Sequence, residues 1–194
     1  MKYISRLMSI SPTSSHPKQR QLISIRSLVP GGWIEQAEPG ISFHCDDGTL
    51  PPDSLIAKWG PLFTECCAAF GKPIDWLNNM TSAISSAGFI NITEKNYKVP
   101  LGDWAKNPLL KEAGKLSQAQ LLQGMEGYAL FVLTHHPVKP WSPEEVKIFL
   151  DKVRAEVEEG RFHAYSFKKR VWAQKPLDDK EVMPEVVVGS AVEG

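Results

Sequence analysis

The stretch Leu28-Val29-Pro30-Gly31-Gly32-Trp33-Ile34-Glu35-Gln36-Ala37-Glu38 decides how the rest of the chain is interpreted. Pro30, Gly31 and Gly32 form a turn signal, and residues 33–37 are strand-like because aromatic and branched side chains favour strands. Only 27 residues precede the stretch, and none of them is glycine. The stretch therefore predicts a turn and a strand at the start of the folded region.

The segment before this turn, residues 1–27, is rich in serine and basic residues, and the first acidic residue of the chain is Glu35. Such an acid-poor start is typical of an organelle transit peptide. Pro12 and Pro17 interrupt any long amphipathic helix, however. We therefore favour the alternative, a disordered basic tail.

Composition limits the possible classes of function. The chain has 194 residues, 42% of them hydrophobic and 23% charged, and its formal net charge is zero. This indicates a globular chain with no electrostatic signal for nucleic acid and no apolar run long enough for a membrane span. The three cysteines, Cys45, Cys66 and Cys67, favour a reducing compartment, so we expect a cytoplasmic or nuclear protein. Cys66 and Cys67 are interpreted as core residues.

Hydrophobic spacing predicts the elements that follow the first strand. A turn is expected at 46–49, and a helix at 53–70, where Pro61 should kink or split it and Gly71 should end it. Asp75 is expected to cap a second helix that ends at Gly88, and residues 89–99 read as a strand. Residues 101–117 look irregular.

A long helix is predicted after Ser117, with its apolar residues between Leu121 and Leu133. Gly124 and Gly127 in it either weaken the helix or permit close packing or the approach of a ligand. Ser142-Pro143-Glu144-Glu145 is a capping box that begins the next helix, and Gly160 should end it. Alternation over 163–172 predicts a final strand. Residues 178–194 are expected to form a flexible tail.

The resulting order is strand, helix, helix, strand, helical insert, helix, strand. Four motifs in this order resemble the fungal LaeA-like methyltransferases, which are class I, S-adenosylmethionine-dependent enzymes and regulators of secondary metabolism: P-G-G-W-I-E with Glu38, D-D-G-T-L at 46–50, H-A-Y at 163–165, and Lys175-Pro176. The resemblance covers residues 28–177. It implies an α/β chain with a partial class I (Rossmann-like) methyltransferase fold, made of the C-terminal strands 5 to 7 and a helical lid.

The half of that fold that would bind the cofactor is missing from the resemblance. The family's Gly-x-Gly loop, where backbone amides approach the cofactor, has no counterpart here, and neither does the acidic residue that holds the ribose. We therefore assign no cofactor-binding residue, although the family implies S-adenosyl-L-methionine as cofactor. The strand at 33–37 should also have an open edge, because its family neighbour is absent.

Candidate acceptor-binding residues follow from the resemblance, which places acceptors beyond the carboxyl ends of strands and at the lid. These residues are Glu38, His44, Tyr128 and His135. Three of them have a structural alternative: Glu38 a solvated turn carboxylate, Tyr128 a core residue, and His135, with His136, a favourable charge at a helix C-terminus. No catalytic residue and no metal site is assigned.

Two functions remain open from the sequence. The first is a methyltransferase-like protein of fungal secondary-metabolite biosynthesis or its regulation, acting on a small-molecule metabolite. The second is a catalytically inactive remnant that binds a protein partner or associates with itself through the open sheet edge. Neither nucleic acid nor membrane is expected as a partner.

Overall fold

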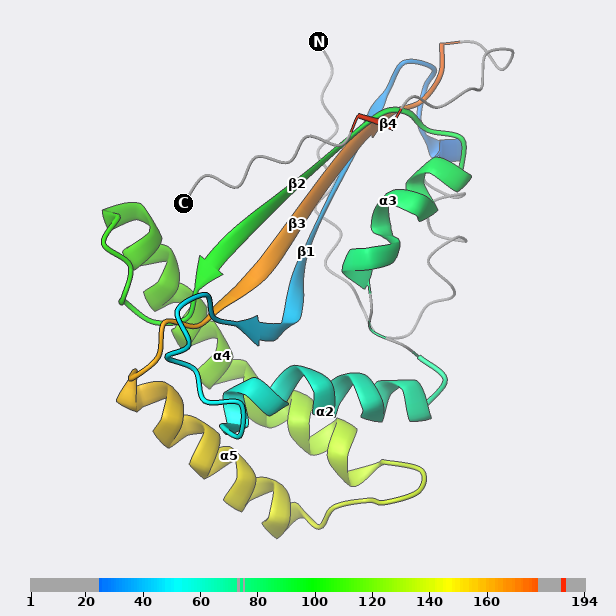
Figure 1. The fold of residues 1–194 in the computed structure, drawn as a ribbon. Coiled ribbons are helices and arrows are strands. Elements are labelled where there is room, and N and C mark those ends of the chain that lie inside the picture. Colours follow the sequence, from blue (N-terminus) through cyan, green and yellow to red (C-terminus); the bar gives the residue numbers. More distant parts are fainter. Residues whose placement is uncertain (1–24, 73, 75, 178–185, 188–194) are drawn as a thin grey trace. The chain divides into compact units, whose positions relative to one another are not determined.

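The structure is a computed structural model, and it describes residues 25–72, 74, 76–177 and 186–187 (Figure 1). The chain divides into two compact units. Unit 1 comprises Met1–Pro39, Trp76–Tyr97 and Lys168–Gly194, and unit 2 comprises Gly40–Asp75 and Lys98–Phe167. Residues 1–24, which hold most of the predicted basic tail, and 178–185 and 188–194 of the predicted flexible tail lie outside the described residues.

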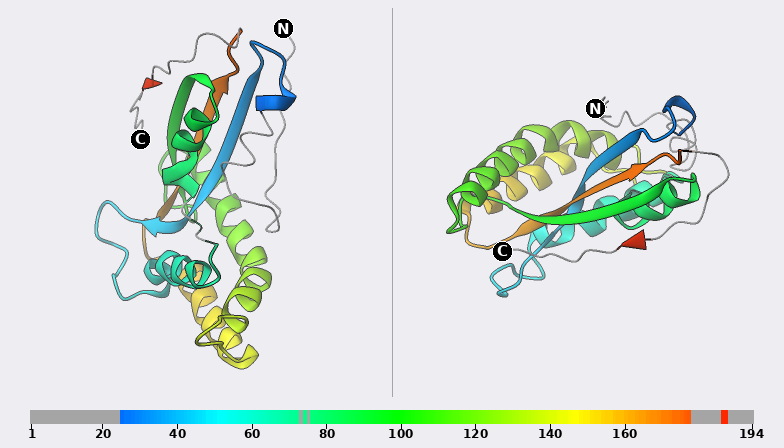
Figure 2. Two further views of the ribbon diagram at one scale, coloured as in Figure 1. Left: turned by 90° about the vertical axis from the view of Figure 1, so that its right-hand side faces the viewer. Right: turned by 90° about the horizontal axis from the view of Figure 1, so that it is seen from above.

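A four-stranded sheet has the order β1-β3-β2-β4, with β1 at Trp33–His44, β2 at Ile90–Pro100, β3 at Tyr165–Gln174 and β4 at Val186–Val187. Figure 2 shows β3 between β1 and β2 in both views. β3 is antiparallel to both, because Leu101 N–H donates to Ala164 C=O at 2.8 Å and Lys175 N–H donates to Gly32 C=O at 2.8 Å. β4 pairs in parallel with β2, Val186 opposite Ile92. The expected strands are confirmed, and β1 continues past the predicted residues 33–37 to His44.

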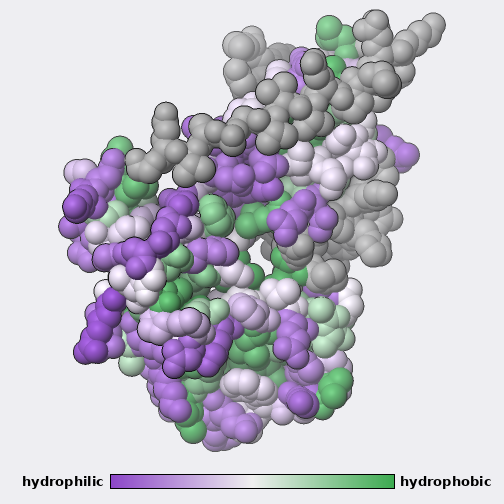
Figure 3. Space-filling view, in the orientation of Figure 1, coloured by the Kyte–Doolittle hydropathy of each residue, from purple (hydrophilic) through white to green (hydrophobic). Residues whose placement is uncertain are grey.

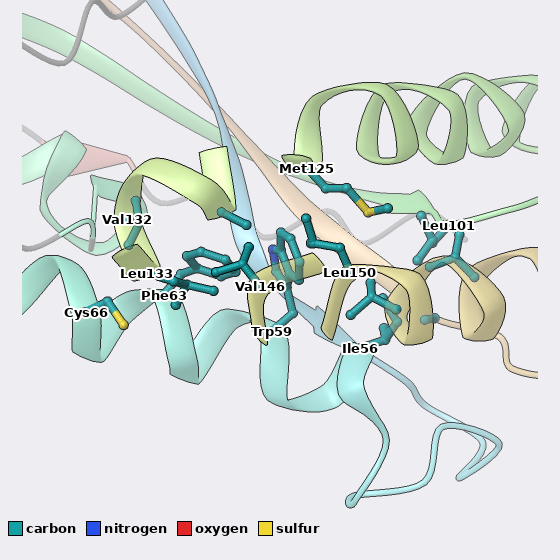
Figure 4. Close-up of a cluster of buried hydrophobic side chains, with 14 of the residues drawn as sticks. Ile56, Trp59, Phe63, Cys66, Leu101, Met125, Val132, Leu133, Val146 and Leu150 are labelled. Atoms are coloured by element: carbon teal, nitrogen blue, oxygen red, sulfur yellow. The ribbon is translucent and has the colours of Figure 1, made fainter. Parts of the chain in front are cut away.

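Unit 2 has a hydrophobic core formed mainly by three helices, α2 at Leu55–Ala69, α4 at Pro108–Thr134 and α5 at Pro143–Glu159 (Figure 4). α4 and α5 pack on each other and both contact α2. The buried side chains include Ile56, Phe63, Leu133, Val153 and the two thiols of Cys66 and Cys67. The prediction that Cys66 and Cys67 are core residues is confirmed.

α4 begins at Pro108, ten residues before the predicted helix, which was expected to follow Ser117, so the prediction of an irregular segment at 101–117 is wrong for 108–117. The Asn107 side chain accepts from the N–H groups of Leu109 at 2.9 Å and Leu110 at 3.3 Å. Pro108 follows at the first helical position, where its missing N–H costs nothing. Asn107-Pro108 is therefore a cap signal that hydrophobic spacing alone does not reveal.

The capping box at the start of α5 is confirmed. Ser142 Oγ accepts from Glu145 N–H at 3.2 Å, and Ser142 N–H donates to Glu145 Oε2 at 2.7 Å. The helix ends at Gly160, which has a left-handed φ of 61°. Ser142 thus satisfies one of the free N–H groups at the helix start, and Glu145 accepts the N–H of the cap residue itself.

α2 is a single helix although it contains Pro61, so the alternative that Pro61 splits it is wrong. Two interactions hold its first turn: Ser54 Oγ accepts from Ala57 N–H at 3.1 Å, and the Glu156 carboxylate of α5 accepts from the N–H groups of Leu55 and Ile56 at 3.0 and 3.1 Å. A negative charge at this end of a helix is favourable. Glu156 therefore joins α5 to the start of α2.

Unit 1 has its own smaller core. Met80 and Ile84 of α3, which spans Trp76–Ser86, pack there with Phe89, Ile92 and Val171. Met80 and Ile84 are buried in this core, and Gly88, with φ 91°, follows the helix. The predicted cap Asp75 lies outside the described residues.

The surface of unit 2 is mixed. Figure 3 shows hydrophilic side chains over much of the visible face, with hydrophobic residues scattered among them. Exposed apolar residues such as Phe131, Val138 and Ile148 are of the kind found singly on ordinary protein surfaces. Within the described part of the chain, every helix is too short or too polar to cross a bilayer.

Candidate functional site

Three chain segments meet in unit 2 where strands end. β1 ends at His44 and continues into the turn that contains Asp46 and Asp47, β2 reaches this edge at Lys98, and β3 begins here at Tyr165. They meet because β3 runs antiparallel to its two neighbours. The carboxyl ends of strands are where open α/β sheets commonly bind ligands. We call Asp46, Asp47, Lys98, His163 and Tyr165 the strand-end cluster.

Asp47 is the centre of the turn after β1. Its Oδ1 accepts from Thr49 N–H at 3.1 Å, from Thr49 Oγ1 at 2.8 Å and from Cys45 Sγ at 2.9 Å. An aspartate that accepts from a backbone N–H two residues later forms an Asx turn, which fixes the loop locally. The next residue, Gly48, adopts a left-handed φ of 75°, so glycine is favoured there.

His163 joins this turn to the start of β3. Its Nδ1 lies 2.5 Å from Asp47 Oδ2, and its backbone N–H donates to Thr49 Oγ1 at 2.8 Å. The imidazole lies beside the Trp104 ring, 5.0 Å between centroids, and Trp104 Nε1–H donates to Ala164 C=O at 2.9 Å. The ring of His163 is therefore held on one edge by a carboxylate and on one face by an indole, while about half of its side chain stays exposed.

Asp46 connects the same turn to β2 and β3. Its Oδ1 accepts from the Tyr165 hydroxyl at 2.7 Å, and its Oδ2 lies 2.5 Å from Lys98 Nζ. The Lys98 ammonium also lies 4.6 Å from the centroid of the Tyr165 ring, within cation–π range. These contacts tie all three strand ends together through Asp46.

The two aspartates are held in their charged form. The hydrogen bond from Lys98, followed by that from Tyr165, keeps the pKa of Asp46 below its usual value. The thiol of Cys45, followed by His163 and Thr49, holds the pKa of Asp47 well below its usual range. Burial, with the hydrogen bond to Asp46 second, raises the pKa of the Tyr165 hydroxyl. The cluster thus contains two carboxylates, a cation, a protonated phenol and an imidazole.

Of the four residues predicted from the sequence, His44 lies beside this cluster. It is the last residue of β1, and its exposed ring is 5.9 Å from that of Tyr165 and 5.1 Å from that of Phe167. Glu38 is different: it lies inside β1 in unit 1, is 8% exposed, and accepts from Gln36 Nε2 at 3.2 Å. The expectation that Glu38 lies at the carboxyl end of the strand or in a solvated turn is wrong, because β1 continues for six more residues.

Tyr128 and His135 lie on α4 and have other surroundings. The Tyr128 hydroxyl is 3.7 Å from Cys67 Sγ and its ring 4.8 Å from that of Phe63, while 37% of the residue is exposed. Burial, with the hydrogen bond to Cys67 second, raises the pKa of Tyr128. His135 is the C-cap residue of α4, and its Nδ1 is 3.0 Å from Phe131 C=O. A substrate-binding role for these residues stays a prediction.

The residues of the D-D-G-T-L and H-A-Y motifs were not predicted to form a site. The signal was present: a pair of acids before a glycine turn, and a His-x-Tyr pair at the start of a strand. What spacing could not show is that residues more than a hundred positions apart meet. Among the residues that the structure describes, no group of three or more His, Cys, Asp or Glu is placed to hold a metal ion.

Comparisons with known proteins identify relatives of this chain, although no family model matches it. It is 36% identical to methyltransferase pytC of Aspergillus terreus over 77% of this chain and 45% of that protein. It is 32% identical to the secondary metabolism regulator LAE1 of Cochliobolus heterostrophus over 87% of this chain and 55% of that protein. It is 30% identical to the probable methyltransferase tdiE of Emericella nidulans over 77% of this chain and 47% of that protein.

The chain is a homologue of the fungal LaeA-like methyltransferases over part of their length. It spans about half the length of the curated relatives that it matches. A solved structure, phosphoethanolamine N-methyltransferase 2 of Haemonchus contortus in complex with S-adenosyl-L-methionine, aligns at 16% identity with a TM-score of 0.37, over 82% of this chain and 30% of that one. That structural likeness is too low to support any conclusion.

The described residues of this LaeA-like chain do not fit a site for S-adenosylmethionine. A Gly-x-Gly loop lets backbone amides approach such a cofactor at a helix start, and no Gly-x-Gly occurs in the sequence. The acidic residues of the strand-end cluster are already bonded to Lys98, Tyr165, His163 and Thr49. No residue of this chain is therefore assigned to the cofactor.

Proposed function

We propose that this chain provides the acceptor-binding part of an S-adenosylmethionine-dependent methyltransferase that acts on a small-molecule metabolite of fungal secondary metabolism. Homology to the LaeA-like family supports the reaction class. The observation that carries the proposal for this chain is the strand-end cluster, where two family-like motifs distant in sequence meet at strand ends. Methyl transfer needs an acceptor held in place and, for hydroxyl acceptors, a group that takes its proton.

The alternative is a non-catalytic protein that binds a partner or a second copy of itself. Two observations favour it: the sequence contains no Gly-x-Gly segment, and β1 lies at the edge of the sheet among the described strands. An open strand edge can pair with another chain. The two functions make different demands on the strand-end cluster, since only the first needs it as a chemical site.

Gene disruption with metabolite profiling by mass spectrometry tests the proposal. If the protein takes part in a methylation, the disrupted strain should lose one metabolite and accumulate a precursor lighter by one CH₂ group. The intact gene should restore the product, and the Asp151→Asn gene, changed on the exposed side of α5, should restore it equally. A general decline of many metabolites, without a lost product and a precursor lighter by one CH₂ group, would instead support a regulatory role. An unchanged metabolite profile would contradict both the methylation and the regulatory role.

A further inference from the structure

Within the strand-end cluster, one side chain combines a fixed orientation with an unused nitrogen. His163 Nδ1 is 2.5 Å from Asp47 Oδ2, and Asp47 is itself fixed by Thr49 and Cys45. Because a carboxylate only accepts hydrogen bonds, this contact places a proton on Nδ1. In the neutral ring the lone pair then lies on Nε2. Nε2 of His163 makes no hydrogen bond to any residue that the structure describes.

We propose that His163 is the catalytic base of this chain, with Asp47 as its positioning residue, and that it takes the proton from a hydroxyl group of the methyl acceptor. This inference rests on the proposed function. In the step, the acceptor O–H bond breaks, the electron pair stays on oxygen, and a new N–H bond forms at Nε2. The resulting imidazolium lies against the Asp47 carboxylate, which stabilises its charge, and the proton later passes to water.

Three features distinguish His163 from the other described histidines. His44 contacts aromatic rings, His135 Nδ1 lies near the Phe131 carbonyl, and His136 Nδ1 accepts from the N–H groups of Val138 and Lys139. His163 alone among them is paired with a carboxylate, packs on an indole ring, and belongs to a cluster at strand ends. This is the arrangement that orients an imidazole as a base.

The charge state of Asp47 fits the role of positioning residue. Donors from Cys45, His163 and Thr49 keep it ionised, so it would not take the proton from the imidazolium. The neighbouring Asp46 is occupied by Tyr165 and Lys98, which leaves it less able to compete for the acceptor's proton. The aromatic rings of Trp104, Tyr165 and His44 nearby suit an acceptor that carries its hydroxyl on a flat ring.

Nitrogen NMR of the full chain labelled at histidine tests the geometry without any assay of activity. In mildly alkaline solution, where an imidazole is neutral, His163 should carry its proton on Nδ1 and none on Nε2. Asp47→Asn should remove this bias, while the signals of His44, His135 and His136 should not move. A proton on Nε2, or a charged imidazolium under these conditions, would overturn the inference because no base would be available.

Complementation of the disrupted strain tests the chemistry. His163→Asn keeps an N–H donor where Nδ1 lies but removes Nε2, so the chain should keep its urea midpoint while methylation in extracts falls at least about a hundredfold. Asp47→Asn should also reduce the rate, and Asp151→Asn should not. Full methylation by His163→Asn would overturn the inference and leave the proposed function standing. Disruption without any metabolic effect would overturn both.

Discussion

Asp47 accepts hydrogen bonds from Cys45 and Thr49 and is paired with His163, and these contacts hold its pKa well below its usual range. A carboxyl group whose pKa is lower in the folded chain stabilises the fold at pH values above its unfolded pKa. That contribution disappears as the pH falls toward the folded pKa. The contribution of Asp47 to the free energy of unfolding is therefore lost in acid.

We predict that the free energy of unfolding falls as the pH is lowered below about 4, the pKa of an unperturbed aspartate, and that Asp47→Asn makes this fall shallower. Urea unfolding at a series of pH values, followed by tryptophan fluorescence, measures it. Asp151→Asn on the exposed side of α5 is the matched control, because it removes the same charge away from the strand-end cluster. Parallel pH profiles for Asp47→Asn and the original chain would contradict the prediction.

At the scale of single residues, the sequence identified candidate side chains, but it did not always place them correctly relative to the end of β1. His44 was expected near a strand end and is there, whereas Glu38 was placed at the end of a strand that in fact continues to His44. β1 continues through Pro39 and Gly40, which is possible because an edge strand tolerates proline. The pairing of Asp47 with His163 could not be predicted, since it depends on where distant chain segments meet.

Among the elements, α5 carries the clearest local signal, and its capping box forms as predicted. Ser142→Ala should lower the free energy of unfolding by about 1 kcal/mol, because the N–H of Glu145 loses its partner. Chemical denaturation of the two chains measures the difference. Ser86→Ala, at the exposed end of α3, is the control and should change little. An equal urea midpoint for Ser142→Ala and the original chain would show that the cap contributes nothing.

Replacement of glycine by alanine should have opposite effects on stability at Gly60 of α2 and at Gly127 of α4. A Cβ at Gly60 would lie 2.5 Å from Ser42 Cα and 2.7 Å from Ser42 Cβ, so α2 touches β1 too closely for alanine. A Cβ at Gly127 meets nothing within 4 Å. The alternative that Gly124 and Gly127 serve close packing is therefore wrong, since Gly124 is equally open.

We predict that Gly60→Ala destabilises the chain by about 1–3 kcal/mol through overpacking, and that Gly127→Ala stabilises it by about 1 kcal/mol through helix propensity. Thermal unfolding of the two variants beside the original chain measures whether each substitution lowers or raises the stability. Each variant serves as the other's control. Stabilisation by Gly60→Ala would mean that β1 and α2 can move apart without cost.

Hydrophobic spacing predicted elements whose signal is local and missed what depends on tertiary contacts. The capping box of α5 and the C-terminal Gly160 are local, and both were found. The start of α4 at Pro108 was missed, although Leu109, Ala113 and Leu116 follow a helical spacing, because residues 101–117 were interpreted as irregular. The contact of Glu156 with the first turn of α2 joins residues a hundred positions apart and has no local signal.

For the molecule as a whole, the missing Gly-x-Gly segment leads to a prediction about the cofactor. The purified chain by itself should bind S-adenosylmethionine weakly or not at all, because its sequence contains no Gly-x-Gly loop that could present backbone amides to it. Isothermal titration measures this. A dissociation constant of about 1 μM, which corresponds to about −8 kcal/mol, would contradict the prediction and would show that other residues of this chain form a cofactor site.

Among the described strands, β1 has β3 on one side only, and it is twelve residues long. Trp33 at its start is 41% exposed, and Ile34 and Ala37 are only partly buried. A long edge strand with apolar side chains can pair with another chain, and Pro39 blunts this edge at a single position only.

We therefore expect the isolated chain to associate with itself as its concentration rises, which sedimentation and light scattering over a concentration series would measure. Trp33→Lys should reduce the association, because a charge at the edge disfavours strand pairing. Ile148→Lys, which places the same charge on an exposed apolar position of α5, is the control and should leave the association through β1 unchanged. A monomer at all concentrations that unfolds cooperatively would count against the prediction, because it would mean that the edge of β1 does not pair with a second copy.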